Sequence, residues 1–186
     1  MSNPEFFLWC DLETTGLRPK VDSILEMALV ITDADFNELG RQNIIFKRTL
    51  NFGDFSPEVI EMHTKNGLWL DVINKGIPPY SRINYEISQW IVKTTGLSEW
   101  GAWTKIYLAG SSIHFDVGFL RVNNFSFIND VSHRYFDVSV FRTALKMWRP
   151  DVLWPQNDTH RAMDDILDHI EEAKHYKRFM LRDWGA

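Results

Sequence analysis

Apolar residues in the first half of the chain fall in short runs separated by turn-forming segments. The runs are Phe6 to Cys10, Ile24 to Thr32 and Gln42 to Lys47, and the segments between them are Gly16 to Ser23 and Asp33 to Gly40. Short apolar runs bounded by Gly, Pro, Asn and Asp are typical of buried strands. The first half is therefore predicted to be rich in β-strands.

The second half alternates between apolar residues at helical spacing and one more short apolar run. The predicted elements are a helix that Ser81 caps and that ends near Gly96, a strand over Ile106 to Ala109, and helices over Val117 to Asn123, Val138 to Trp148 and about Arg161 to Met180. This order predicts an α/β fold, a mixed β-sheet flanked by α-helices. Because no repeat or linker divides the sequence, residues 1–186 are predicted to form one domain.

Composition limits the class of protein. Of the 186 residues, 45% are hydrophobic and 24% are charged, which is typical of a soluble globular protein. Cys10 is the single cysteine, so a reducing compartment is the simplest setting. The sequence shows neither the features of a signal peptide nor an apolar stretch of membrane-spanning length, and we expect a cytoplasmic protein with no membrane partner. A net charge of -5 argues against coating long nucleic acid, but a short oligonucleotide needs few phosphate contacts.

Two acids, Asp11 and Glu13, stand where the first apolar run ends. Side chains alternate along a strand, so residues two positions apart share a face and these two carboxylates can converge on one cation. The competing interpretation is that Asp11 only opens a turn before Thr14-Thr15-Gly16, which is the commoner meaning of an isolated pair of this kind.

Three further reactive side chains stand at the ends of predicted elements. Asp116 opens a helix, and His160 and Asp165 stand at the start of the last helix. Singly, each has a structural explanation, because an acid in a first turn caps a helix or favours its dipole. Together with Asp11 and Glu13, they supply the carboxylates and the base that two-metal phosphodiester hydrolysis requires. Carboxylates suit Mg²⁺ or Mn²⁺, and a histidine can accept a proton from water near neutral pH.

The same residues occur in an ordered set that resembles the three motifs of the DEDDh 3'-to-5' exonucleases. The motifs are Trp9-Cys10-Asp11-Leu12-Glu13-Thr14-Thr15-Gly16-Leu17, His114-Phe115-Asp116, and His160 with Asp165 five residues on. Within that superfamily the chain looks most like the oligoribonucleases, to which it is similar at 32–35, 61–68, 108–113, 134–139 and 148–150. The resemblance extends from about Phe6 to Tyr176.

This resemblance implies a ribonuclease H-like fold, with the whole chain as one DEDDh exonuclease domain, and an activity. The implied enzyme is a metal-dependent 3'-to-5' exoribonuclease that degrades short RNA oligonucleotides to nucleoside 5'-monophosphates. By position, the ligands of two divalent cations, Mg²⁺ or Mn²⁺, would be Asp11, Glu13, Asp116 and Asp165. His160 would be the general base. Asp164 stays an alternative, because a helix that began before His160 would place Asp164 on its face, whereas the family spacing selects Asp165.

The resemblance also implies contacts to the bases of the substrate. Leu17 and His63 would wedge the terminal bases. Without the resemblance, Leu17 is better interpreted as ordinary core and His63 as a surface residue at a helix end, since a single Leu or His carries little information.

The 5' phosphate would be held by Ser112, Arg134 and Ser139, because Arg grips phosphate bidentately and hydroxyls complete the oxygen shell. His133 departs from the family, which commonly has a Tyr there that reaches the phosphate of the neighbouring subunit. A histidine still donates a hydrogen bond, but it is shorter than a tyrosine and its charge depends on pH.

A homodimer is also expected. Trp is enriched in the centres of protein interfaces, and several tryptophans lie in segments that are expected to be partly exposed. They are Trp69, Trp100, Trp103 and Trp154.

Two other functions remain open at this point. One is a DNA exonuclease of the same superfamily, acting on single-stranded DNA, because the metal chemistry does not depend on the sugar 2'-hydroxyl that distinguishes RNA. The other is a catalytically silent domain that only binds nucleic acid. All five reactive positions are filled, which argues against the silent domain.

Overall fold

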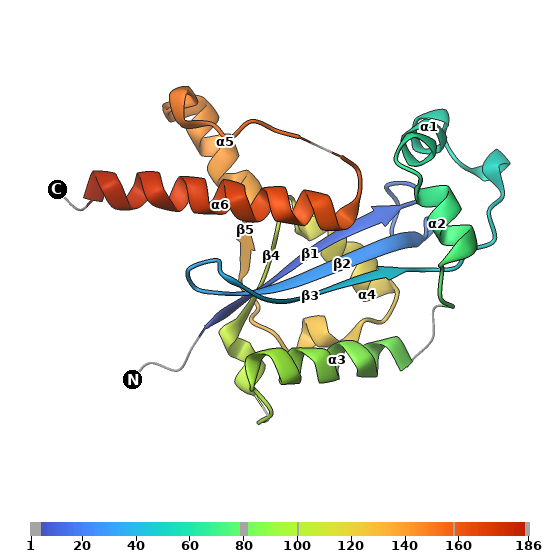
Figure 1. The fold of residues 1–186 in the computed structure, drawn as a ribbon, viewed down its shortest axis with the longest axis horizontal. Helices are drawn as coiled ribbons and strands as arrows, with labels where there is room; N and C mark the ends of the chain where they lie inside the picture. Colours follow the sequence, from blue (N-terminus) through green and yellow to red (C-terminus); the bar gives the residue numbers. More distant parts are fainter. Residues whose placement is uncertain (1–4, 79–81, 100, 158, 185–186) are drawn as a thin grey trace.

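The computed structural model describes residues 5–78, 82–99, 101–157 and 159–184. Within these ranges five strands form one mixed sheet in the order β3-β2-β1-β4-β5 (Figure 1). The strands are β1 (Phe6–Thr14), β2 (Ile24–Asp33), β3 (Glu38–Ile45), β4 (Ile106–Gly110) and β5 (Tyr135–Asp137). The predicted α/β class is confirmed.

Helices lie on both faces of this sheet. In the described ranges they are α1 (Pro57–Lys65), α2 (Leu68–Asn74), α3 (Arg82–Thr95), α4 (His114–Val122), α5 (Val138–Trp148) and α6 (Ala162–Trp184). Short 3₁₀ turns occur at Phe52–Asp54, Ala102–Lys105, Ser126–Asn129 and Pro150–Val152. The long helix α6 runs across one face, α3 covers the other, and α1 and α2 stand beside the start of β2 (Figure 1). Within the described part of the chain, we find no helix with both the length and the apolar character needed to cross a membrane.

The central strand β1 pairs with a neighbour on each side. It is antiparallel to β2, with Glu13 opposite Glu26, and parallel to β4, with Trp9 opposite Ala109. Trp9 packs in the layer beneath α6 and donates from Nε1 to the hydroxyl of Thr32 at 3.1 Å. Because side chains alternate along a strand, Asp11 and Glu13 point to the same face as Trp9, toward α6.

Two strand boundaries differ from the predictions. β1 continues to Thr14, so Asp11 and Glu13 lie inside a strand, and the turn interpretation of this acid pair is wrong. The third strand begins at Glu38, within the segment predicted as a turn, and it ends at Ile45. β3 is an edge strand in which half of the residues are exposed and one is buried, so its backbone pairing with β2 holds it in the sheet without a strong apolar pattern.

Helix boundaries agree more closely with the predictions. Helix α5 has the predicted bounds, α6 begins one residue after Arg161, and α4 begins at His114, three residues before Val117. Helix α3 is described from Arg82 onward, and its predicted cap, Ser81, lies outside the described residues.

Several elements were not predicted from the sequence, namely α1, α2 and β5. Ser56 caps α1 by accepting a hydrogen bond from the backbone N–H of Val59 at 3.4 Å, and Pro57 occupies its first turn. Helix α2 buries Trp69, which is 5% exposed against a cluster that includes Leu25. The expectation that Trp69 is partly exposed is therefore wrong, and Trp100 lies outside the described residues.

Candidate active site

A hollow of about 300 Å³ opens at the carboxyl end of β1, between the loop after this strand and the start of α6. Several of the sequence-predicted residues line it together, namely Asp11, Glu13, Leu17, His160 and Asp165. Strands β1, β4 and β5 run parallel, so their carboxyl ends meet at this edge of the sheet, where ligands of α/β proteins commonly bind.

Asp116 reaches this group of acids from helix α4. It lies in the first turn of α4 and is buried, and its carboxylate accepts a hydrogen bond from the backbone of Leu12, between the two β1 acids. The chain turns from β4 into α4 at this point, which carries the carboxylate to β1 although about a hundred residues separate the two in sequence.

His160 and Asp165 complete the constellation from the start of α6. Atoms of Glu13, His160 and Asp165 that can bind a metal all lie within 4.8 Å of one another. Thr159 donates to Oδ1 of Asp165 from its backbone N–H at 2.9 Å and from its hydroxyl at 2.8 Å, which orients the carboxylate. Asp164 is exposed to solvent, whereas Asp165 is buried in the hollow. The helix begins after His160, as the family spacing requires.

The acids in this site repel one another. Burial, and then the charge of Asp11, raise the pKa of Glu13 from 4.5 to about 9. Burial and the charge of Asp11 also hold the pKa of Asp116 well above its ordinary value. A divalent cation would relieve this repulsion, and oxygen-rich donor sets are the ones that Mg²⁺ and Mn²⁺ prefer, so these residues fit metal ions.

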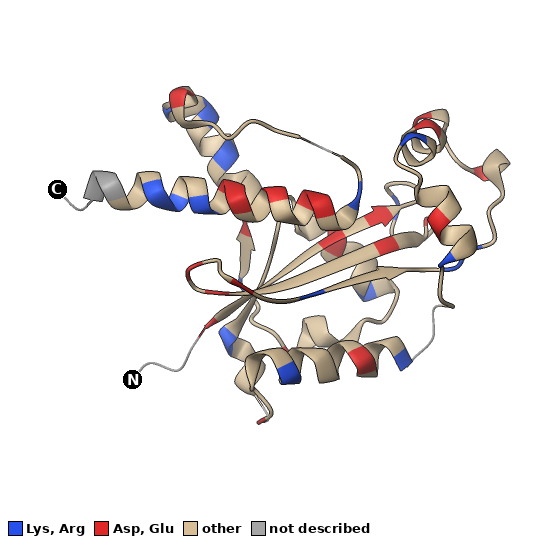
Figure 2. Ribbon diagram, viewed as in Figure 1, with Lys and Arg blue, Asp and Glu red and all other residues tan. Residues whose placement is uncertain are grey.

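Charges are distributed unevenly around the site. Acidic residues on α6 gather in the half nearest the hollow, and its lysines and arginines lie toward the C-terminal end (Figure 2). Acids near the N-terminus of a helix and basic residues near its C-terminus interact favourably with the helix dipole. Cations bound at the acids of the hollow would make the approach of a phosphate group more favourable.

The two residues predicted to wedge bases are placed differently. Leu17 is 80% exposed on the rim of the hollow, so it is not a core residue. His63 is 0% exposed, and it donates from Nε2 to the backbone carbonyl of Thr14 at 3.0 Å and packs edge-on against Trp69. Its interpretation as a surface residue is wrong, and stacking on a base would require α1 to move.

The predicted phosphate-binding residues are brought together only in part. Oδ1 of Asp137 accepts hydrogen bonds from the backbone N–H of Ser112 at 3.0 Å, and from Ser139 through its backbone N–H at 3.0 Å and its hydroxyl at 2.7 Å. Arg134 and His133 are exposed just before the opposite end of β5, and the charge of Arg134 acts on Tyr107 there.

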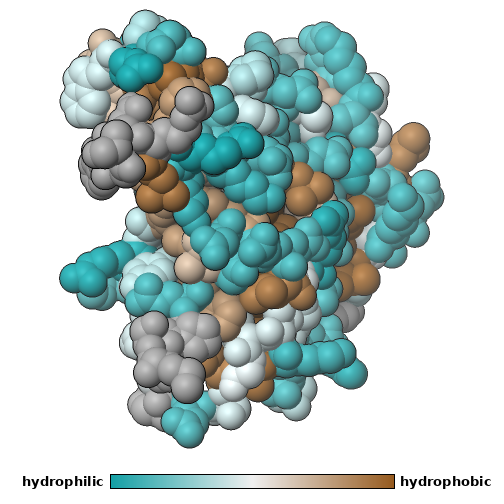
Figure 3. Space-filling model, turned by 60° about the vertical axis from the view of Figure 1, so that its left-hand side comes forward, coloured by the Kyte–Doolittle hydropathy of each residue, from teal (hydrophilic) through white to brown (hydrophobic). Residues whose placement is uncertain are grey.

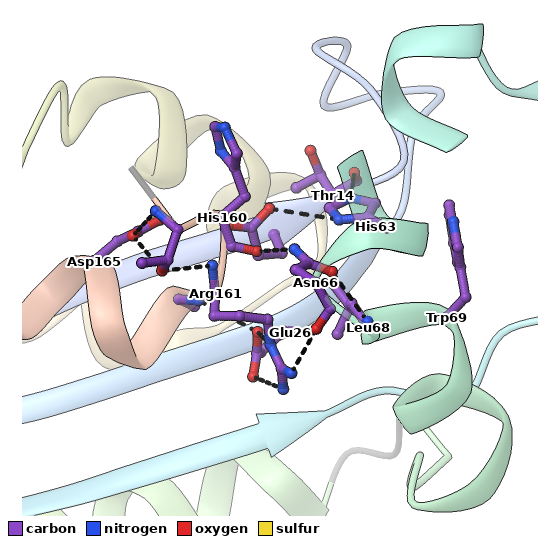
Figure 4. A network of polar contacts seen from close by, with 12 residues as sticks. Thr14, Glu26, His63, Asn66, Leu68, Trp69, His160, Arg161 and Asp165 are labelled. Atoms are coloured by element: carbon purple, nitrogen blue, oxygen red, sulfur yellow. Dashed lines mark hydrogen bonds and ion pairs between the residues drawn. The ribbon is translucent and has the colours of Figure 1, made fainter. Parts of the chain in front are cut away.

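Sequence reasoning missed other residues around the site. His169 is buried on α6, lines the hollow, and has no hydrogen-bond partner at Nδ1. Glu26 is fully buried and forms an ion pair with Arg161, next to His160 (Figure 4). A signal for Glu26 exists in the sequence, since it is the only charged residue in the apolar run of the second strand, from Ile24 to Thr32.

Comparisons with known proteins agree with this site. A family described as exonuclease (RNase_T) matches residues 8–173. The chain is 32% identical to the oligoribonuclease of Ectopseudomonas mendocina, over 98% of this chain and 99% of that protein. It is 30% identical to the oligoribonuclease of Neisseria meningitidis, over 97% and 95% of the two chains. It is 35% identical to a probable oligoribonuclease of Dictyostelium discoideum, over 91% and 87%.

Solved structures show the same fold. The complex of E. coli exonuclease I with single-stranded DNA and zinc superimposes on 96% of this chain with a TM-score of 0.69 and 21% identity. A metal-free form of the same complex superimposes with a TM-score of 0.66 and 23% identity. This chain spans 41% of the length of each exonuclease I chain.

Proposed function

Because the chain belongs to the oligoribonuclease family of exonucleases, we propose that it cleaves short RNA from the 3' end and releases nucleoside 5'-monophosphates. The observation that carries the proposal is the meeting of Glu13 and Asp165 with His160 in one hollow, with Asp11 and the buried Asp116 beside them. A domain that only binds nucleic acid has no use for such closely spaced acids, since they repel phosphates.

Two divalent cations, Mg²⁺ or Mn²⁺, are proposed as the cofactors, with Asp11, Glu13, Asp116 and Asp165 as their ligands. When bound, such ions stabilise the attacking and leaving oxygens of an in-line displacement at phosphorus. The raised pKa values of Glu13 and Asp116 support this assignment, because ionising both groups together requires added positive charge.

His160 is proposed as the general base. The residue is exposed and its ring points away from the polar contacts beneath it, toward the open hollow (Figure 4). A water molecule there would transfer a proton to His160 as its oxygen attacks the phosphorus. The bond from phosphorus to the 3' oxygen of the preceding nucleotide breaks, and that oxygen gains a proton to become a hydroxyl.

Substrate contacts are proposed at two places. Leu17, exposed on the rim, would pack on a terminal base and would position the last phosphodiester bond over the acids. Ser112 and Ser139 would hold the 5' phosphate, since Asp137 brings their backbones together, and Arg134 would reach this phosphate from the other end of β5.

A homodimer is proposed as well, and the apolar surface of α5 supports it. Val140, Met147 and Trp148 are exposed on this helix, and Trp148 is 73% exposed. The face of the molecule in Figure 3 is mostly hydrophilic, with hydrophobic areas between the polar ones. Exposed aromatic and Met side chains of this kind are enriched in interfaces. His133, also exposed, would contact the phosphate bound by the partner subunit.

The cytoplasm is proposed as the compartment. Cys10 is the single cysteine and is buried and free, so the protein needs no oxidising compartment to form a disulfide. Burial also raises the pKa of its thiol, which makes the thiol less reactive. Short RNA from turnover of longer transcripts would be available there.

The test compares RNA and single-stranded DNA of equal short length with wild-type protein, His160→Ala and Asp11→Asn, each with Mg²⁺, Mn²⁺ or EDTA. We expect the wild type to release mononucleotides from RNA only with metal, and both variants to lose activity by about a hundredfold or more while remaining folded. Equal turnover by the wild type and His160→Ala would refute the mechanism. Preference for DNA would instead identify a DNA exonuclease. Light scattering coupled to gel filtration tests the dimer, with Trp148→Glu as the disrupting variant.

A further inference from the structure

The backbone of His160 adopts a conformation that needs support. Its φ angle is 55°, in the left-handed region that non-glycine residues rarely occupy. The residue is also exposed, so side-chain packing does not hold it in place. Conformations of this kind persist only where surrounding contacts determine them. The contacts that hold His160 therefore matter for its proposed role.

One such contact comes from the junction of α1 and α2. The side-chain amide of Asn66 donates from Nδ2 to the backbone carbonyl of His160 (Figure 4). The other end of the same amide, Oδ1, accepts from the backbone N–H of Leu68 at 3.0 Å, at the start of α2. Asn66 is thus fixed by its own helix junction, and it connects this junction to a residue 94 positions away.

A second set of contacts holds the next residue, Arg161. Its guanidinium donates to both carboxylate oxygens of Glu26 at 3.1 Å, to Asp71 of α2 at 2.9 Å and to the backbone carbonyl of Asn66 at 3.3 Å. Arginine suits this position because its planar group carries several donors in fixed directions. The side chain of Arg161 therefore fixes the backbone just after His160 to β2, to α2 and to the α1–α2 junction.

Glu26 is the fixed point of this arrangement. It is fully buried on β2 and also accepts hydrogen bonds from the backbone N–H of Ala162 at 3.3 Å and from Nδ2 of Asn43 at 2.9 Å. In the pairing of β1 with β2 it stands directly opposite Glu13. The contacts of Glu26 thus tie the start of α6 to the strand pair that carries the proposed metal ligands.

We propose that Asn66 and Arg161, anchored by Glu26, are positioning residues that hold His160 over the acidic site. They are not among the proposed metal ligands, and they act on His160 through the backbone at and after the histidine. The charge of Arg161 also lowers the pKa of Glu13, whereas Asn66→Ala leaves that charge in place. Their catalytic effect rests on the proposed function, in which His160 is the general base. The contacts themselves do not depend on the proposed function, and they can be tested without any substrate.

Two variants remove these contacts without leaving a buried charge unpaired. Asn66→Ala deletes the hydrogen bond to His160, and the double variant Glu26→Gln/Arg161→Met removes both members of the ion pair. Loss of only one member of a buried pair is strongly destabilising, so the single variants at these positions are avoided.

The chain offers a matched control for the double variant. Arg142 of α5 makes the same two-pronged contact, at 2.9 and 2.6 Å, with Glu172, a fully buried acid of α6. Glu172→Gln/Arg142→Met therefore removes an equivalent ion pair, between α5 and α6, away from the backbone of His160. Any general effect of losing a buried ion pair appears equally in this control.

The first measurement is the protection of the backbone amides at positions 161 and 162 against hydrogen exchange, in the absence of substrate. We expect faster exchange in Asn66→Ala and in Glu26→Gln/Arg161→Met, and no change in the control. The second measurement is steady-state hydrolysis of a short RNA with Mn²⁺. We expect kcat to fall about tenfold or more in the two test variants, with KM within about twofold of wild type, because displacing a catalytic group slows chemistry more than binding.

Several results would overturn the proposal. It fails if the folded test variants keep the wild-type exchange rates, whatever their activity. It also fails if exchange becomes faster but kcat stays within about twofold of wild type, or if the control loses as much kcat as the double variant. A wild-type protein that hydrolyses neither RNA nor DNA would refute the proposed function, and the exchange rates would then decide by themselves whether these residues hold His160.

Discussion

Glu13 of β1 and Glu26 of β2 stand opposite each other across the central strand pair, and both are buried. The two acids differ in their partners. Glu26 is paired with Arg161, whereas Glu13 faces the charges of Asp11 and Asp165 and lies 3.9 Å from Nδ1 of His63. The strand pair therefore carries an acid paired with an arginine opposite an acid whose pKa burial and neighbouring acids raise to about 9.

The first prediction concerns the pH dependence of stability in the metal-free protein. The pKa of Glu13 is about 9 in the folded state, above its ordinary value of 4.5. Between these values the folded state binds a proton that the unfolded state has released, so the contribution of Glu13 to stability is present at low pH and is lost as pH rises. We expect Glu13→Gln to weaken this loss. The measurement is urea unfolding in EDTA at about pH 6 and about pH 8.5.

An equal decline with pH in the wild type and Glu13→Gln would contradict the assignment of this proton to Glu13. Glu61→Gln is the control, because Glu61 is exposed on α1 and its ion pair with Lys65 lies at the surface.

Metal binding should release protons. Glu13 and Asp116 both have raised pKa values, and a metal ion binds the deprotonated carboxylates. We therefore expect the affinity for Mn²⁺ to increase as pH rises from about 6 to about 8.5. Calorimetry in buffers of different ionisation enthalpy measures the number of protons released. An affinity that is independent of pH would show that these carboxylates are already ionised.

Two neighbouring acids on α6 should differ sharply in importance. Asp165 is buried in the hollow and Asp164 is exposed. We expect Asp165→Asn to lower kcat by about a hundredfold or more, because a metal ligand is lost, and Asp164→Asn to stay within about twofold of wild type. Both variants should remain helical by circular dichroism. Similar losses in the two variants would mean that the wrong acid has been assigned.

Leu17 should matter for substrate and not for folding. Because its side chain is 80% exposed, Leu17→Ala should change the free energy of unfolding by no more than about 0.5 kcal/mol. We expect KM for a dinucleotide to rise severalfold, since the variant loses apolar contact with a base. An unchanged KM for substrates of every length would remove Leu17 from the substrate site.

His63 should show the opposite behaviour. Its ring is fully buried and its Nε2 satisfies the carbonyl of Thr14, so His63→Ala leaves a cavity and an unpaired buried acceptor. We expect a loss of about 1–3 kcal/mol in the free energy of unfolding, measured by urea denaturation. If His63→Ala instead raises KM with full stability, α1 must move on substrate binding and expose this position to a base.

Much of the fold could be predicted from local pattern. The apolar runs of β1, β2 and β4 and the helical spacing of α3, α5 and α6 are strong because these elements bury a face against the core. Helix α1 was missed because it buries little besides His63, and α2 because it has only seven residues. Strand β5 was missed because its three residues carry too little periodicity. The exposed start of β3 carries no apolar pattern at all.

The sequence by itself indicated the chemistry that we propose for this protein. The spacing of Asp11 and Glu13 places them on one strand face, and the family motifs add Asp116, His160 and Asp165. Only the tertiary structure decided how these groups are held and which neighbours they have. Glu26 and Arg161 are 135 positions apart, and Asn66 and His160 are 94 apart. No local pattern encodes such pairs, because the packing of α1, α2 and α6 against β2 brings them together.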